Sequence, residues 1–499
     1  MSVHGLRIGA GSRWLAAVLM MLTAGVVIGC AQARPGARVP VLTVERATVG
    51  PPMPSGFVGL SMEYRGFAAY AGQDPNAVSP VFLQLLRNLA PAQRPVLRIG
   101  GDSTDWTWYP SAHLRRPQGV RFDLTGSYLR VVRALTQTLD ARLILGVNLE
   151  ADSRRLAAAE ARAFLDVIGR PSIDALEIGN EPELYGSFPW YKTPAGQHIS
   201  GRPRGYDFAA YMRDFTSFAA ALPQVPLAGP STGSPSFIQA LAPFLAGEPR
   251  VGIATLHAYP LKNCGGANDV TMSQLLSSSS AAGLAATLAP YVAIARRHGD
   301  GLRIDEMNAI SCGGERGVSD TFGSALWAIK ALFAMARVGV AGVNIHTVPG
   351  TINEIIGAGQ VGGVWQSVVH PEYYGMMMFE QAAPAGARLL SVAGPSGGAV
   401  QAWATRATDG HVRVMLINPG AGSETVDVRV PGKSGPATLE QLQASSLRST
   451  LGITLGGQSF GSHTSTGLLA GQPATVLVSP GSDGYSVTLR GAGAAMLTL

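Results

Sequence analysis

From Gly56 to Gln381 the sequence repeats one pattern, in which a short apolar run bounded by Gly or Pro precedes a segment with helical spacing of its apolar residues. Runs rich in Val, Ile and Leu are typical of strands buried on both faces of a parallel sheet. Eight such units predict an α/β fold, a (β/α)8 TIM barrel with enlarged loops. An open doubly wound sheet is the alternative, which the lack of a G-x-G-x-x-G motif after the first run disfavours. The expected strands are Gly56–Met62, Val96–Gly100, Arg142–Asn148, Ala175–Gly179, Pro226–Gly229, Ile253–Ala258, Leu302–Glu306 and Gly342–His346.

A different pattern begins at about residue 384. Short runs now alternate apolar and polar residues, with Gly, Pro and Asp turns between them, and the expected strands are Val400–Arg406, His411–Asn418, Thr425–Val430, Thr475–Ser479 and Tyr485–Arg490. This period of two predicts a C-terminal antiparallel β-sandwich domain over 384–499. Residues 34–50 contain a similar run, Val39–Thr48, which we expect to add a strand to the β-domain. The expected barrel domain then spans 51–383.

Residues 1–33 have the features of a signal peptide. Arg7 and Arg13 precede an apolar run, Trp14–Ile28, which is shorter than the roughly 20 residues that a membrane span needs. Ala31-Gln32-Ala33 is an A-x-A-like cleavage site, whereas Val27-Ile28-Gly29-Cys30 resembles a lipoprotein box in which Cys30 is lipidated. Both interpretations predict an exported protein that is secreted, periplasmic or lipid-anchored at the bacterial cell surface.

Charge and cysteine content limit the partners that we expect. The chain has 38 basic and 32 acidic residues, a net charge of +6, and this scattered excess predicts no nucleic-acid binding. A lipid at Cys30 is the one membrane contact expected. Because no cluster of His, Cys and carboxylates has metal-ligand spacing, we expect no metal and no cofactor.

Two acidic motifs follow expected barrel strands, at the end of a barrel where chemistry takes place. Strand four ends in Gly179-Asn180-Glu181-Pro182, and strand seven ends in Asp305-Glu306. These strands lie three steps apart around the ring, so Glu181 and Glu306 can face each other across the barrel mouth. A retaining glycosidase needs two carboxyl groups about 5–5.5 Å apart, one as acid/base and one as nucleophile. Asn180 would place an amide beside the acid, where it can bond a sugar 2-hydroxyl.

These motifs resemble glycoside hydrolase family 79, the heparanase and bacterial β-glucuronidase family of clan A retaining glycosidases. The resemblance also rests on Arg98–Ser103 (RIGGDS), on His257–Pro260 (HAYP) and on the β-domain, and it covers about residues 37–499. It implies that Glu181 is the acid/base and Glu306 the nucleophile.

The same resemblance implies roles for other residues of the sugar site. Asn180 would hold the sugar 2-hydroxyl, Tyr259 would orient the nucleophile, and His346 would line the subsite. Packing roles in the core are the alternatives for Tyr259 and His346. Glu63 and either Asp102 or Asp105 are candidate acceptors for sugar hydroxyls, and a turn or capping role is the alternative for each Asp.

One departure from the family pattern concerns the sugar carboxylate. Glucuronate-binding members present a Tyr, one further residue and a Gly after the nucleophile, and here the segment is Ser311-Cys312-Gly313. Gly313 is retained, and Ser311 can replace the tyrosine hydroxyl through a water molecule. A second tyrosine expected a few residues past His346 is also replaced, and the nearby Glu354 would repel a uronate. The catalytic pair and the sugar specificity are therefore separate predictions.

Cys264 and Cys312 follow the expected strands six and seven. Neighbouring strands of a parallel barrel lie about 4.8 Å apart, so loops that leave their same ends can bring two cysteines within bridging range. Export favours oxidation. We predict a Cys264–Cys312 disulfide, with two free buried thiols as the alternative.

The sequence as a whole predicts an exported, cofactor-independent, retaining exo-β-glycosidase that acts on a carbohydrate or glycoconjugate, most like a β-glucuronidase. A β-glucosidase or other neutral β-glycosidase with the same machinery is the alternative within this class. A non-catalytic carbohydrate-binding protein is the alternative outside it. Such a protein has no need to keep both Glu181 and Glu306, which disfavours this interpretation.

Overall fold

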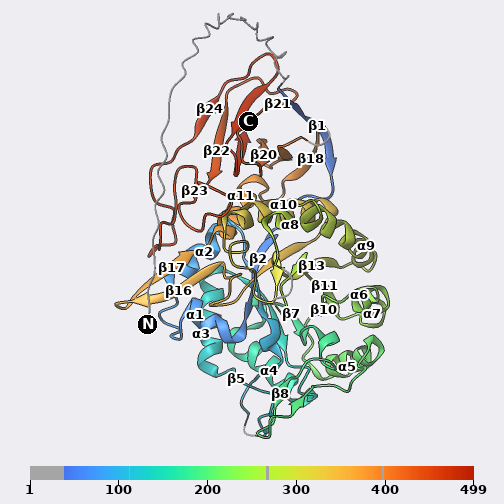
Figure 1. Ribbon diagram of the computed structural model, residues 1–499. Helices are drawn as coiled ribbons and strands as arrows, with labels where there is room; N and C mark the ends of the chain where they lie inside the picture. The colour runs from blue at the N-terminus through green and yellow to red at the C-terminus, as the bar shows by residue number, and fades with distance from the viewer. Residues whose placement is uncertain (1–38, 112, 266–268, 396–397) are drawn as a thin grey trace, which may run out of the picture. The chain divides into compact units, whose positions relative to one another are not determined.

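The computed structural model describes residues 39–111, 113–265, 269–395 and 398–499. The signal peptide predicted for residues 1–33, with Cys30, lies outside these ranges. Within them, eight parallel strands close into a barrel, which confirms the predicted fold class (Figure 1). In barrel order the strands are β2 (Val58–Glu63), β3 (Val96–Gly100), β6 (Arg142–Val147), β7 (Ile173–Ile178), β10 (Leu227–Thr232), β11 (Val251–Ala258), β13 (Gly301–Met307) and β15 (Gly342–Thr347).

Amphipathic helices alternate with the barrel strands along the chain. Ser79, Thr125, Ser153 and Asp207 each begin a helix and accept a hydrogen bond from the backbone N–H three residues later, which satisfies a donor that the first turn leaves free. The α-helices are α1 (Tyr64–Ala71), α2 (Pro80–Leu89), α3 (Gly126–Leu139), α4 (Arg154–Ala163), α5 (Phe208–Ala221), α6 (Pro235–Ile238), α7 (Leu241–Gly247), α8 (Met272–Leu275), α9 (Leu284–Arg297), α10 (Phe322–Val338) and α11 (Pro371–Ala382).

The C-terminal strands form a ten-stranded sheet within the described residues, in the order β23-β22-β26-β20-β19-β18-β1-β21-β25, with β24 beside β22. Figure 1 shows β1, in blue, among the orange and red strands of this sheet. The predicted antiparallel arrangement has one exception, because β1 pairs in parallel with β21. The strands are β1 (Val41–Val49), β18 (Arg388–Ala393), β19 (Gln401–Arg406), β20 (Val412–Asn418), β21 (Glu424–Arg429), β22 (Ala437–Gln443), β23 (Thr454–Leu455), β24 (Val476–Val478), β25 (Tyr485–Leu489) and β26 (Gly493–Thr498).

Short two-stranded sheets decorate the loops of the barrel. They are β4 (Thr107–Trp108) with β5 (Phe122–Asp123), β8 (Tyr191–Lys192) with β9 (His198–Ile199), β12 (Leu261–Lys262) with β14 (Ile310–Ser311), and β16 (Ile356–Val361) with β17 (Val364–Val369). In the described part of the chain, no helix has both the length and the apolar character needed to cross a membrane.

The barrel helices α10 and α11 pack against the β-domain. Phe333 of α10 stacks on Trp403 of β19 with ring centroids 5.4 Å apart, and its edge contacts Phe379 of α11 at 4.9 Å. The buried apolar cluster of the barrel continues into the β-domain through Met415 and Ile417 of β20. The two parts therefore share a hydrophobic core.

Candidate active site

Glu181 follows β7 at the C-terminal end of the barrel, where the chain turns sharply. Gly179 and Glu181 have positive φ values of 78° and 46°, and Pro182 begins a 3₁₀ turn, η4 (Pro182–Leu184). A left-handed conformation costs free energy for a residue with a Cβ atom. The Glu181 N–H donates to the Ser231 carbonyl at 3.0 Å, which helps to hold this conformation. The turn leaves the Glu181 side chain 23% exposed.

Glu306 lies near the end of β13 and is held by neighbouring strands. Its Oε2 accepts a hydrogen bond from Arg98 Nη1 at 2.6 Å, and its Oε1 accepts one from the Tyr259 hydroxyl at 2.8 Å. Burial alone would raise the pKa of Glu306. The charges of His346, His257 and Arg98 and the Tyr259 hydrogen bond instead hold that pKa well below its usual range. Glu306 is therefore ionised at neutral pH.

The two carboxylates lie close together but in different environments. One oxygen of Glu181, one oxygen of Glu306 and one ring nitrogen of His257 all lie within 4.8 Å of one another. This spacing matches retaining glycosidases and is shorter than the roughly 6.5–9.5 Å of inverting ones. Glu306 is 10% exposed and bound to a guanidinium, whereas the more exposed Glu181 pairs with His257. Glu306 is therefore the firmly held carboxylate of the two, and Glu181 is the one open to solvent and to a leaving group.

Arg98 on β3 is fully buried and joins the two halves of the site. It binds Glu306 through Nη1, and its Nη2 donates to Asn180 Oδ1 at 2.7 Å. Because Arg98 occupies the amide oxygen, the Asn180 amide NH₂ points the other way, and Nδ2 lies 3.3 Å from Asp102 Oδ1. Arg98 thus orients Asn180 so that it offers a donor beside Asp102.

The protonation state of His257 determines whether Glu181, His257 and Glu306 could hold a metal ion together. Its Nδ1 lies 2.9 Å from Glu181 Oε1, and its Nε2 lies 3.0 Å from Ser231 Oγ. Burial lowers the pKa of His257, but the charges of Glu306 and Asp305 and the hydrogen bond with Glu181 raise it to about 10. A protonated imidazole has no lone pair to give to a metal. The cluster is therefore suited to proton and charge transfer.

Asp102 lies in the 3₁₀ turn η1 (Gly101–Thr104), next to the catalytic pair. The residue as a whole is exposed to solvent, but its carboxyl group is crowded by the other acids of the site. Its surroundings raise the pKa of Asp102 well above the usual value, through burial of the carboxyl and through the charges of Glu63, Glu181 and Glu306. Asp102 can therefore both donate to and accept from a hydroxyl group in this position.

Glu63 and His346 lie on the Asp102 side of the site. Glu63 Oε1 accepts from the Asp102 N–H at 3.2 Å and Oε2 from the Ser103 N–H at 2.8 Å, so the turn occupies much of its carboxylate. His346 has Nε2 3.8 Å from Glu63 and Nδ1 3.7 Å from Glu306. The structure thus brings His346 close to Glu306, and it gives Glu63 a role in holding the turn that carries Asp102.

The prediction that Asp105 accepts a sugar hydroxyl is wrong. Asp105 is buried, and four donors fill its oxygens. Oδ1 accepts the N–H groups of Leu149 (2.8 Å) and Glu150 (3.0 Å), and Oδ2 accepts the Asn180 N–H (3.0 Å) and the Tyr185 hydroxyl (2.6 Å). Asp105 therefore fixes the backbone at Asn180, which is the turn role that the sequence left open.

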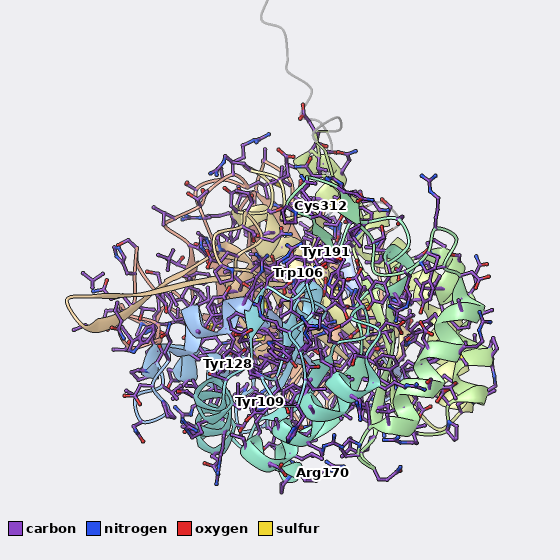
Figure 2. All side chains as sticks on the ribbon, turned by 90° about the horizontal axis from the view of Figure 1, so that it is seen from below. Trp106, Tyr109, Tyr128, Arg170, Tyr191 and Cys312 are labelled. Atoms are coloured by element: carbon purple, nitrogen blue, oxygen red, sulfur yellow. A yellow bond between two sulfur atoms is a disulfide. The ribbon has the colours of Figure 1, made fainter. Side chains whose placement is uncertain are left out.

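Cys264 and Cys312 form the predicted disulfide, with Cα atoms 5.3 Å apart. The bridge lies beside the pairing of β12 with β14, the short strand that ends in Ser311. The Gly313 carbonyl accepts the N–H groups of residues 352 and 353 at 3.0 and 3.2 Å. Figure 2 labels Cys312 above Tyr191 and Trp106 in the view from below. The loop with Ser311 and Gly313 is therefore held both by the disulfide and by the loop after β15.

Sequence reasoning assigned no role to Arg98, His257, Glu177 or Asp305, which lie within the barrel beneath the site. Arg98 and His257 stood in motifs that carried the resemblance. The sequence did contain a sign of their role. Arg98 and Glu177 each interrupt an otherwise apolar strand, and a buried charge requires a partner of opposite charge.

A closed barrel that carries two such carboxylates at its C-terminal end, together with a β-domain, defines a (β/α)8 glycoside hydrolase. Residues 401–496 match the glycosyl hydrolase family 79 C-terminal beta domain, which confirms the predicted resemblance to that family. No curated protein matches the chain.

Solved structures share the fold over most of the chain. A 4-O-α-L-rhamnosyl-β-D-glucuronidase from Fusarium oxysporum 12S, solved as a Rha-GlcA complex, is 21% identical, with a TM-score of 0.71 over 92% of this chain and 100% of that one. A GH51 arabinofuranosidase from Xanthomonas axonopodis pv. citri is 16% identical, with a TM-score of 0.64 over 92% and 99%. An α-L-arabinofuranosidase from Thermotoga maritima is 14% identical, with a TM-score of 0.64 and the same coverage.

Proposed function

We propose that the protein is a retaining β-glycosidase that works by double displacement. The observation that carries this proposal is the approach of Glu181 and Glu306 to within 4.8 Å in unlike environments. Glu306 attacks the anomeric carbon while Glu181 protonates the glycosidic oxygen, which leaves a glycosyl ester on Glu306. Glu181 then takes a proton from the water that attacks the same carbon. Two inversions give net retention.

His257 is placed to stabilise negative charge on either carboxylate during this reaction. In the first step negative charge disappears from Glu306 and appears on Glu181. The His257 cation lies within 4.8 Å of both groups, so it stabilises the charge before and after the transfer. The Arg98 and Tyr259 hydrogen bonds lower the pKa of Glu306 and so keep it ionised for the attack.

We propose a β-glucuronide as the substrate, cleaved from the end of the glycan. The Rha-GlcA complex of the structural neighbour supports a uronate in this fold. Glu354, whose charge would oppose a uronate, accepts the Gly350 N–H at 3.1 Å through Oε2, and burial raises its pKa. Both effects weaken the expected repulsion. Ser311 and Gly313 stand on a loop fixed well enough to bind the sugar carboxylate.

A neutral β-glycoside is the second candidate, because Ser311 stands where a tyrosine binds the carboxylate in the family pattern. A panel of chromogenic β-glycosides separates the two. We expect hydrolysis of the glucuronide with a β-configured first product by NMR. Hydrolysis of the glucoside alone would select the second candidate. An α-configured first product would exclude double displacement, and turnover of no glycoside would leave carbohydrate binding without catalysis.

We also propose that the protein is exported. The apolar run Trp14–Ile28 and the Cys264–Cys312 disulfide both support this proposal. Mass spectrometry of protein purified from membranes and from the soluble fraction distinguishes a lipid-anchored protein from one with ordinary signal cleavage. A diacylated Cys30 at the new N-terminus would show a lipid anchor, whereas a mature chain that begins after Ala33 would show ordinary signal cleavage.

A further inference from the structure

Two fully buried acids, Glu177 on β7 and Asp305 on β13, lie in the barrel interior beneath the catalytic pair. Both carboxyl groups lie beside the same guanidinium, with Arg98 Nε 2.9 Å from Glu177 Oε1 and 3.9 Å from Asp305 Oδ2, and each shifts the pKa of the other. Glu177 Oε2 and Asp305 Oδ1 accept no hydrogen bond from any donor group among the described residues. Two ionised carboxylates repel each other strongly in a buried site, and a hydrogen bond between them requires a proton. The geometry thus fits one proton shared by two carboxyl groups.

The surroundings indicate which acid carries the proton. Glu177 Oε1 accepts from Arg98 Nε at 2.9 Å and from Nη2 at 2.5 Å. Asp305 Oδ2 lies farther from cations, 3.8 Å from His257 Nε2 and 3.9 Å from Arg98 Nε. Burial would raise the pKa of Glu177, but the charges of Arg98 and His257 and the contacts with Arg98 and Asp305 together lower it, whereas burial and the Glu177 charge raise that of Asp305. The proton therefore resides on Asp305.

We propose that Asp305 is a positioning residue that shares one proton with Glu177, so that the pair holds a single negative charge between Arg98 and His257. Its effect on catalysis rests on the proposed double displacement, because Arg98 binds Glu306 and His257 binds Glu181. A second negative charge would draw both cations away from the catalytic carboxylates. Without the shared hydrogen bond, Glu177 and Arg98 would lose their fixed position under Glu306.

Charged and titratable groups face this pair from several elements. They are Arg98 on β3, His257 on β11, Arg303 and Glu306 on β13, Tyr64 on α1 and Tyr211 on α5. Of these groups, Arg98 and His257 are the cations with a nitrogen atom within 3.9 Å of the pair. These two positive charges are balanced by one negative charge on Glu306 and one on the pair, so a net charge of −1 on the pair leaves the buried cluster neutral.

Infrared difference spectroscopy tests the proton without using activity. The spectrum of the wild type minus that of Asp305→Asn at pH 7 should contain the C=O stretch of a protonated carboxylic acid, and this band should shift in D₂O. Glu372 and Glu380, whose pKa values burial raises to about 8, contribute to both spectra and cancel. Absence of the band would mean that Asp305 is ionised and would overturn the proposal.

Kinetics tests the positioning role. Asp305→Leu removes the hydrogen bond and should lower kcat/KM by about 100-fold or more, mostly in kcat. Asp305→Asn keeps a donor toward Glu177, so its kcat/KM should lie much closer to the wild-type value than that of Asp305→Leu. The two limbs of its pH–rate profile should stay at their wild-type pH values. Thr255→Val, two residues before His257 on β11, is the matched control for a buried substitution, and circular dichroism at 25 °C checks that each variant is folded.

The two measurements separate failure of this proposal from failure of the proposed function. If the wild type cleaves no glycoside, the infrared band still shows where the proton is. If Asp305→Asn moves the alkaline limb to lower pH by a unit or more, Asp305 carries a negative charge in the wild type and the proposal is wrong. If Asp305→Leu has wild-type kinetics, Asp305 has no positioning role.

Discussion

The neighbours of Glu306 fit its proposed role as nucleophile, with a guanidinium on one oxygen and a phenol on the other. Glu306→Gln keeps an oxygen that can accept from Arg98 or Tyr259, but an amide cannot form the glycosyl ester. We expect kcat to fall on the order of 10⁴-fold or more, a loss typical of removing a nucleophile. Initial rates on the best chromogenic substrate measure it, with the exposed Glu45→Gln of β1 as control. A near-normal rate would remove Glu306 from the mechanism.

Glu181 has the more exposed of the two carboxylates, and the proposed mechanism makes it the acid/base. Glu181→Ala should lose far less rate on substrates with very acidic leaving groups, because these need little protonation. Added azide should restore the rate and give a β-glycosyl azide. Rates for a series of aryl leaving groups, with product NMR, measure both effects. Equal losses for every leaving group, or an α-azide, would contradict the acid/base role.

The cation at His257 also predicts how stability depends on pH. Its pKa is about 10 in the folded protein against 6.5 for the free side chain. A raised folded-state pKa stabilises the protein fully below about pH 6.5, and this contribution is lost as pH rises toward 10. We expect Tm to fall over this range, and to fall less steeply in His257→Gln. Calorimetry at pH 6, 8 and 10 measures the slopes, and equal slopes in the two proteins would contradict a buried imidazolium.

The strands differ in how well the sequence predicted them. The barrel strands match apolar runs such as Arg142–Asn148, because burial on both faces leaves a strong signal. The β-domain strands β18, β22 and β26 were not predicted. β26 (GAAMLT) lacks β-branched residues before its last position, and β22 (ATLEQLQ) consists largely of helix formers. Pairing with neighbouring strands, which no local pattern encodes, makes these segments extended.

The same distinction applies to the site. Glu181 and Glu306 could be located from sequence because each ends an identifiable barrel strand. Asp105 stands three residues after Asp102 in the same turn, and the sequence does not reveal that one side chain faces solvent while the other binds four donors. Similarly, the contact between Glu177 and Asp305 crosses the barrel between strands that are not neighbours, so it depends on closure of the whole sheet.

The disulfide links the segments after β11 and β13, and its cysteines are 48 positions apart in the sequence. A bridge closing a loop of this length stabilises a fold by up to about 4 kcal/mol in the chain-entropy model. Replacing Cys264 and Cys312 together by Ser should lower the unfolding free energy by up to this amount. It should also raise KM more than it lowers kcat, since the bridge holds the loop with Ser311 and Gly313. Urea unfolding and Michaelis kinetics measure the two effects.

A reductant provides the control for that variant. Treating the wild type with dithiothreitol should raise KM in the same way, whereas the double variant should not respond. If the double variant keeps its KM while stability falls, the bridge has a structural role alone. Two alkylated thiols in the non-reduced wild type would rule out the bridge.

On the scale of the whole molecule, the barrel and the β-domain are joined at both ends of the barrel sequence. β1 precedes the first barrel strand yet lies in the C-terminal sheet, between β18 and β21. Residues 40–499 accordingly form one compact unit. The chain cannot complete the β-domain until its last strands are in place, so the barrel and the β-domain should fold and unfold together.

This cooperativity can be tested at Phe333, which is 1% exposed and touches Trp403 of the β-domain and Phe379 of the barrel. Phe333→Ala removes both contacts and should destabilise the protein by about 3–5 kcal/mol. Because the core is shared, loss of tryptophan fluorescence and loss of activity on heating should remain coincident at a lower Tm. The barrel-only variant Phe215→Ala, at a residue packed against Phe244, is the control and should also give one transition. Two separate transitions in Phe333→Ala, with activity surviving the first, would show that the barrel folds independently of the β-domain.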